Sequence, residues 1–143
     1  VKQADSLLLL HPGLLPAAQP PAVARANLEY FEPRYDADGP AMTWAVSFVG
    51  WMRAGDPRKA LDRLNRTLAS AQPPFWTWTE TQDPAVHPED FGAYHFTTGA
   101  GGLVAALTGG LFGVEHVGAG KLRLLRPPLS GGGNSDDGDG DDD

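Results

Sequence analysis

Apolar positions recur along most of the chain with the spacing of helices, and Pro or Gly residues separate the segments. Residues 3–10 predict a short buried helix, and residues 22–32 predict a second helix with Pro21 at its entry. Residues 41–55 are apolar on nearly every side, which is typical of a buried helix. We therefore expect a mainly α fold in which the 41–55 segment lies at the centre.

Another helix is expected after Asp56, which suits an N-cap and is followed by Pro57 at the first helical position. The helical spacing extends to about Gln72, where a Pro-Pro pair ends it, and its apolar positions are Ala60, Leu61, Leu64 and Leu68. Residues 98–113 form a further apolar pattern that is rich in Gly. Small residues at this density predict a helix packed closely against its neighbours.

The pattern changes near residue 112, where strands replace helices. "KLRLL" (121–125) alternates apolar and polar residues after a Gly turn, as a strand does. We expect three parts: a helical part over 1–112, a β segment over 113–129 and a disordered tail over 130–143. The tail is expected to stay solvated because it is a low-complexity acidic segment.

Composition excludes several classes of function. The formal charge of −7 includes six Asp in the tail, and without them it is −1, so no basic stripe for nucleic acid exists. The absence of Cys excludes disulfides, thiolate zinc sites and a Cys nucleophile, and the four His lack ligand spacing. No apolar run reaches the roughly 18 residues that cross a bilayer. We expect a soluble, cytoplasmic protein with no membrane span, metal or cofactor.

The stretch "PPFWTWTETQDP" (73–84) carries the candidate chemistry. Phe75, Trp76 and Trp78 crowd together just before a lone carboxylate, Glu80. Aromatic rings stack on the C–H faces of sugars and exclude water, so these rings could wall a glucose subsite beside a catalytic base. By themselves, the residues also fit a loop whose Glu80 is a solvated charge.

Six ordered motifs decide between these readings: "VKQAD", "NLEYFEPR", "GPAMTWAV", "PFWTWTE", "FTTGAGGLVAAL" and "LRLLRPPL". The order and spacing of these motifs resemble those of glycoside hydrolase family 65 as far as residue 129. Within the family, the resemblance is greatest to the animal branch. The resemblance implies the C-terminal part of an (α/α)6 barrel followed by the start of a small β domain. It also implies a fragment whose general acid lies upstream of Val1, so we expect the isolated fragment to be inactive.

The same resemblance implies roles for individual residues. Glu80 matches the general base, Lys2 and Gln3 match residues that hydrogen-bond glucose, and Trp78 matches a substrate-binding position. The implied activity is inverting hydrolysis of a terminal α-linked glucose, and in the animal branch the substrate is glucosyl-galactosyl-hydroxylysine of collagen. A carbohydrate is therefore the expected partner.

Two alternatives stay open. Phosphorylases of the family hold phosphate with a Ser-rich segment and a His, where this chain has Ala41, Met42, Thr43 and Phe96. Phosphate needs donors or positive charge, so water is the better nucleophile here, and the adjacent His95 receives no role. The other alternative is a catalytically inactive fragment that binds glycan or another partner. The loop after Glu80 is longer than the family suggests, which leaves the aglycone specificity open.

Overall fold

The computed structural model describes residues 5–10, 19–81, 93–116 and 118–125 of the 143-residue chain. Lys2, Gln3, the expected acidic tail (130–143) and residues 82–92 of the loop after Glu80 lie outside the described residues. The helices are η1 (Asp5–Leu10), α1 (Pro21–Phe31), η2 (Glu32–Arg34), α2 (Met42–Arg53), α3 (Pro57–Leu68), α4 (Thr97–Ala105) and η3 (Ala106–Leu111). The strands are β1 (Ala71–Gln72), β2 (Thr77–Trp78), β3 (Val114–His116) and β4 (Leu122–Leu124). The expected mainly α fold, consistent with part of an α/α barrel and the start of a small β domain, is confirmed.

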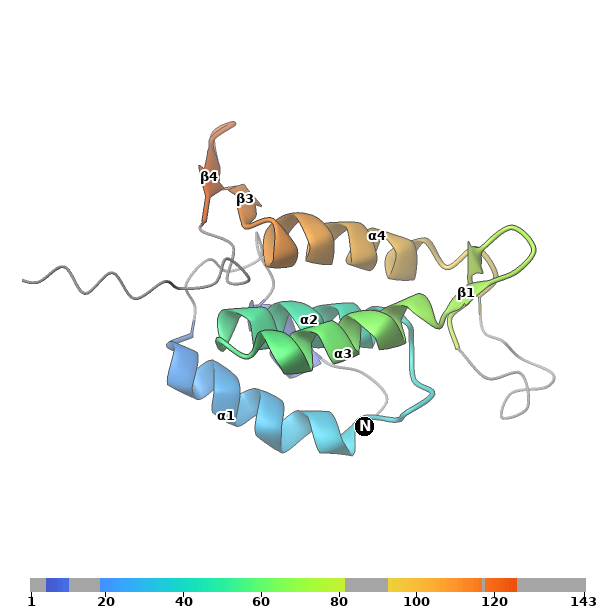
Figure 1. Ribbon diagram of the computed structural model, residues 1–143, viewed down its shortest axis with the longest axis horizontal. Coiled ribbons are helices and arrows are strands. Elements are labelled where there is room, and N and C mark those ends of the chain that lie inside the picture. Colours follow the sequence, from blue (N-terminus) through green and yellow to red (C-terminus); the bar gives the residue numbers. More distant parts are fainter. Residues whose placement is uncertain (1–4, 11–18, 82–92, 117, 126–143) are drawn as a thin grey trace, which may run out of the picture.

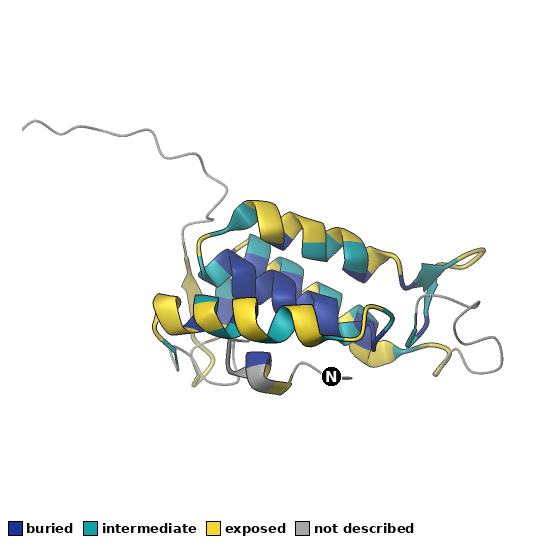
Figure 2. Ribbon diagram, turned by 90° about the horizontal axis from the view of Figure 1, so that it is seen from below, coloured by how far each residue is buried: buried dark blue, intermediate teal, exposed yellow. Residues whose placement is uncertain are grey.

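Helix α2 is the centre of the molecule and contacts η1, α1, α3, α4 and η3. In Figure 1, α1 lies on one side of the α2–α3 layer and α4 lies on the other. Every residue from Thr43 to Met52 is buried, and Figure 2 shows this buried helix between helices with exposed outer faces. The sequence prediction for this helix is confirmed, because a segment without a polar face must be covered on all sides.

Helix α3 begins as expected and ends earlier. The Asp56 carboxylate accepts a hydrogen bond from the Lys59 amide at 3.1 Å, which caps the helix. The helix stops at Leu68, so the prediction that it runs to Gln72 was wrong. Residues 71 and 72 pair instead with β2, because the Pro-Pro pair turns the chain back on itself.

The inward face of α3 also differs from the expected one. Ala60 is buried and Leu64 packs against the core, but Leu61 and Leu68 are 41% and 47% exposed. Thr67 takes a core position instead, where its hydroxyl donates to the Arg63 carbonyl at 3.0 Å. A polar residue can be buried there because the helix backbone satisfies its side chain.

Two antiparallel hairpins lie at opposite ends of the helical layers (Figure 1). The β1–β2 hairpin follows α3, and the β3–β4 hairpin follows η3. The expected strand within 121–125 is confirmed as β4, and Glu115 of β3 forms an ion pair with Arg53 at the end of α2. This hairpin is therefore attached to the helical part, and the β1–β2 hairpin carries the candidate site.

Candidate active site

Glu80 lies two residues after β2, and its backbone is held from two sides. The Ala41 amide donates to the Glu80 carbonyl at 2.8 Å, and the Glu80 amide donates to the Ala93 carbonyl at 3.2 Å. Its carboxylate accepts a hydrogen bond from the Ala93 amide at 3.1 Å through Oε2. The side chain is half-buried, so one carboxylate is fixed in position while it remains accessible.

Thr79 anchors this strand from its other face. Its side chain is 2% exposed, its amide donates to the Ser70 carbonyl at 3.0 Å, and its hydroxyl lies 2.6 Å from the Thr81 carbonyl. Strand β2 ends at Trp78, so the buried Thr79 lies between the end of the strand and Glu80. One short segment, which Thr79 anchors, therefore carries both the predicted sugar-binding indole and the predicted base.

Of the three aromatic residues in the motif, only Trp78 is half-buried. Phe75 is 87% exposed and Trp76 is 70% exposed, and both lie in the turn of the hairpin. Trp76 has φ of 54°, in the left-handed region that non-Gly residues seldom adopt. Phe75 and Trp76 thus do not enclose Glu80 in the described structure, which leaves Trp78 as the one ring of the motif that is partly buried there.

The start of α2 lies directly against the Glu80 strand. Ala41 is fully buried, and its amide is used by the Glu80 carbonyl. Thr43 is 2% exposed, and its hydroxyl has no hydrogen-bond partner among the described residues. Ala41 and Thr43 belong to the segment that the resemblance aligned with a phosphate site, and neither offers a free donor on an accessible surface.

The start of α4 meets the same strand. The Phe96 amide donates to the Trp78 carbonyl at 2.7 Å, and Phe96 is the residue before the first helical position. His95 precedes it with φ of 58° and is exposed. Unusual backbone conformations of this kind cluster at functional sites, and here they occur before and after the Glu80 strand. Segments near residues 41, 80 and 96 are therefore brought together from distant parts of the sequence.

The remaining predicted site residues are not placed. Lys2 and Gln3 lie outside the described residues, so their expected contacts with glucose stay a prediction. Within the described ranges, no group of three or more His, Cys, Asp or Glu could hold a metal ion.

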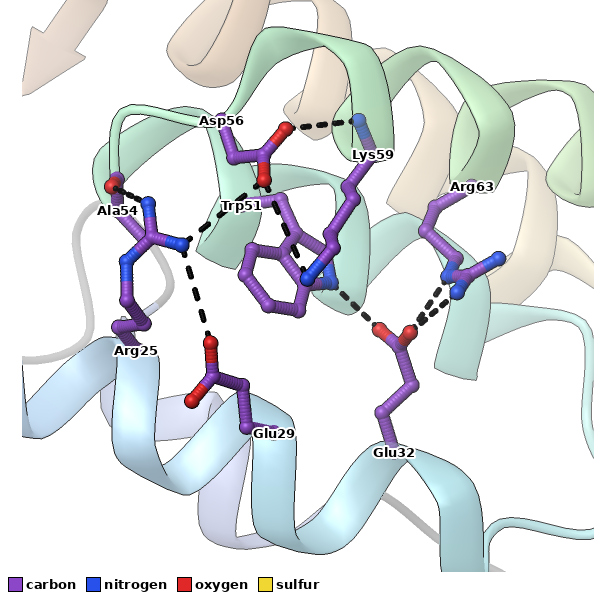
Figure 3. A network of polar contacts seen from close by, with 8 residues as sticks. All are labelled: Arg25, Glu29, Glu32, Trp51, Ala54, Asp56, Lys59 and Arg63. Carbon is purple, nitrogen blue, oxygen red and sulfur yellow. Dashed lines mark hydrogen bonds and ion pairs between the residues drawn. The ribbon is translucent and has the colours of Figure 1, made fainter.

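Sequence reasoning missed a polar network between α1, α2 and α3, which Figure 3 shows. Glu32 accepts a hydrogen bond from Trp51 Nε1 at 2.7 Å and forms an ion pair with Arg63 at 2.5 Å. Burial lowers the pKa of Arg63, but the hydrogen bond and charge of Glu32, with Asp62, outweigh it and raise that pKa overall. Glu32 is thus a structural carboxylate whose two oxygens are both occupied. No periodic pattern in the sequence indicates a buried carboxylate of this kind.

A surface pocket of about 370 Å³ lies beside this network, between η2 and the ends of α2 and α3. Burial, and then the charge of Glu32, raise the pKa of Tyr35 in its wall. The Arg66 guanidinium lies 3.9 Å from the centre of the Trp44 ring and covers it. The Trp44 face in this pocket is therefore not open to a sugar ring.

Among the described residues, no helix is both long enough and apolar enough to cross a membrane.

Comparison with known proteins supports the resemblance read from the motifs. The chain is 41% identical over 120 residues to protein-glucosylgalactosylhydroxylysine glucosidase of Mus musculus, a match that covers 84% of this chain and 16% of the relative. It is 36% identical over 129 residues to the protein of that name in Danio rerio, covering 90% of this chain and 18% of the relative. A kojibiose hydrolase of Mucilaginibacter mallensis is 33% identical over 117 residues, 80% of this chain and 16% of the relative.

These matches are consistent with a glucosidase fragment of the family 65 type and confirm the recognition made from the motifs. The chain spans less than a fifth of the length of each of these three relatives. No protein-family profile and no solved structure matches it.

Proposed function

We propose that this chain supplies the general base and part of the glucose subsite of an inverting glycoside hydrolase. The observation that carries the proposal is the hydrogen bond from the Ala41 amide to the Glu80 carbonyl, which holds a half-buried carboxylate against the starts of α2 and α4. The names of the relatives, two glucosidases and a kojibiose hydrolase, support the glucoside class of substrate.

In the proposed reaction, water attacks the anomeric carbon from the face opposite the leaving oxygen. Glu80 takes the proton from this water, and a second carboxyl group protonates the leaving oxygen. We assign the second group to the part of the relatives' length that these 143 residues do not span. Trp78 packs against the apolar face of the glucose ring, and Lys2 with Gln3 bonds its hydroxyls, as the resemblance suggests.

The same geometry favours hydrolysis over phosphorolysis. An amide at a helix N-terminus is a common phosphate donor, but the Ala41 amide donates to Glu80 and is fully buried. Phe96 contributes a ring, not a donor, at the start of α4. A phosphate dianion beside the Glu80 carboxylate would also meet like charge.

As the substrate we propose a terminal α-linked glucose on a disaccharide unit, such as glucosyl-galactosyl-hydroxylysine. The experiment uses the full-length protein with this substrate and with kojibiose. Glu80→Gln keeps the side-chain shape but removes the base, so hydrolysis should fall by about 10²–10⁴-fold while substrate binding stays within a fewfold. Glu29→Gln is the control, because Glu29 is an exposed carboxylate on α1 and should keep near-normal turnover.

Proton NMR of the early reaction should show β-glucose as the first product, at a rate independent of added inorganic phosphate. Glucose 1-phosphate or α-glucose as the first product would overturn the inverting hydrolytic mechanism. Normal turnover by the Glu80→Gln protein would remove Glu80 from the role of base.

A further inference from the structure

Gly99, in the first turn of α4, lies where the helix, α2 and the Trp78 strand meet. A Cβ atom at Gly99 would lie 2.6 Å from Trp78 Cδ1, 3.0 Å from Phe96 Cδ1 and 3.1 Å from Ala41 Cβ. Carbon atoms in contact are normally about 3.5–4.0 Å apart. Gly99 has ordinary helical geometry, so the glycine is required here by space and not by backbone conformation.

Trp78 has little freedom to move away from an added methyl group. Its carbonyl accepts the Phe96 amide at 2.7 Å, and its strand pairs Trp78 with Ala71. The same point is bordered by the Cβ atom of Ala41, which is itself fully buried. An added side chain at residue 99 must therefore shift the Trp78 strand or the start of α4.

Glu80, the predicted base, follows Trp78 by two residues, so a shift of Trp78 would also move Glu80. Thr79 lies between Trp78 and Glu80, and its side chain is buried and bonded to the Ser70 and Thr81 carbonyls, so the three residues form one anchored segment. The Ala41 residue that borders the Gly99 contact also donates its amide to the Glu80 carbonyl. The contact with Gly99 and the hydrogen bond that fixes Glu80 thus share Ala41, the residue just before α2.

We propose that Gly99 is a positioning residue for the reaction. Its lack of a side chain leaves the space that Trp78 Cδ1 borders, and we call this space the Trp78 seat. The position of Trp78 in this seat sets where the Glu80 carboxylate lies relative to the starts of α2 and α4. The proposal rests on the proposed function for its catalytic consequence, while the seat itself is a matter of packing that can be tested without any activity.

The kinetic test compares Gly99→Ala with Gly102→Ala in the full-length protein. Gly102 is a matched control because it lies on the same helix, also faces α2, and its added Cβ would meet Ala45 Cβ at an ordinary 3.4 Å. Displacing a catalytic group by about 1 Å can cost about 10²-fold, so Gly99→Ala should lower kcat by about 30–100-fold, with KM changed less than about threefold. Gly102→Ala should keep kcat within about twofold. A kcat for Gly99→Ala equal to that of Gly102→Ala would overturn the proposal.

The packing test follows Trp78 directly. With 5-fluorotryptophan incorporated, the Trp78 resonance is assigned by its loss in a Trp78→Phe protein. Gly99→Ala should shift or broaden this resonance, and Gly102→Ala should leave it in place. If the unsubstituted protein hydrolyses no glucoside, the proposed function fails. The spectrum would still test whether Gly99 makes room for Trp78. An unmoved Trp78 signal in Gly99→Ala overturns the seat whatever the activity.

A third variant covers the case in which Gly99→Ala does not fold. Removing the indole removes the closest clash, so Gly99→Ala combined with Trp78→Ala should yield folded protein in the amount that Trp78→Ala alone gives. Recovery of folding in the double variant supports the seat. Failure of the double variant, with Trp78→Ala folded, would show that Gly99 is needed for another reason and would end the proposal.

Discussion

At the scale of single residues, Glu32 joins the three helices around the core. Its carboxylate lies at the end of α1, and it binds the Trp51 indole of α2 and the Arg63 guanidinium of α3 (Figure 3). The side chain is only 10% exposed. A carboxylate buried to this degree is stable only because both of its oxygens are bonded.

Replacing Glu32 by Ala should therefore destabilise the fold by about 2–3 kcal/mol, since Arg63 and Trp51 would each lose a buried partner. Asp62→Ala is the matched control, because Asp62 also pairs with Arg63 but is 64% exposed, and its loss should cost less than about 1 kcal/mol. Chemical denaturation of the dilute chain, followed by tryptophan fluorescence, measures both changes. Equal losses for the two variants would contradict the structural role assigned to Glu32.

At the scale of elements, α3 combines a capped start with a narrow buried face. Leu61 and Leu68 are exposed, so much of the contact with α2 comes from small or polar residues such as Ala60 and Thr67. The Asp56 side chain satisfies the Lys59 amide, and Pro57 needs no partner at the first position. Two local features therefore fix the start of the helix: the hydrogen bond of the Asp56 cap and Pro57 at the first position.

Asp56→Ala removes this cap and should lower stability by about 1 kcal/mol, whereas Asp56→Asn should retain most of it because Asn also caps well. Hydrogen exchange should show faster exchange for the amides of the first turn of α3 in Asp56→Ala alone. If Asp56→Asn were as damaging as Asp56→Ala, the charge contacts of Asp56 with Arg25 and Lys59 would be the larger contribution.

At the scale of the whole molecule, large apolar side chains remain on the surface. Val104 of α4 is 61% exposed and Phe112 after η3 is 60% exposed, while the hairpin residue Leu124 is 76% exposed. The segment 97–112 contains no charged residue, although one side of it is open to solvent. Apolar surfaces of this extent are typical of interfaces.

We expect the purified 143-residue chain to self-associate as its concentration rises, to bind a hydrophobic dye, and to release no glucose from α-glucosides. Self-association is expected because α4 has an apolar surface. Inactivity is expected because inverting hydrolysis requires a second carboxyl group, which we assign to a part of the relatives that this chain does not span. Analytical ultracentrifugation and a glucose assay test the two parts separately. A monomeric chain would contradict the first expectation, and an active one would contradict the proposed division of catalytic groups.

Much of the fold could be predicted because it is encoded locally. Pro21 and Pro57 mark helix starts, and the all-round apolar 41–55 segment identifies the central helix α2. The end of α3 could not be predicted in this way, since the apolar spacing continues past Leu68 while the backbone already turns toward a hairpin. The aromatic motif was likewise predicted as one wall, yet Phe75 and Trp76 are exposed in the turn and only Trp78 is half-buried.

The sequence by itself determined the resemblance of this chain to glucosidases, because its ordered motifs, "PFWTWTE" among them, identify such relatives without any geometry. It also determined which carboxylate to consider. Tertiary structure alone decided that Ala41, Trp78, Phe96 and Gly99 meet around the Glu80 strand, and that Glu32 is a structural group. The physical reason is that motifs and helix signals act over a few neighbouring residues. Contacts between residues 41, 80 and 99 exist only after the helices have packed and excluded water from between them.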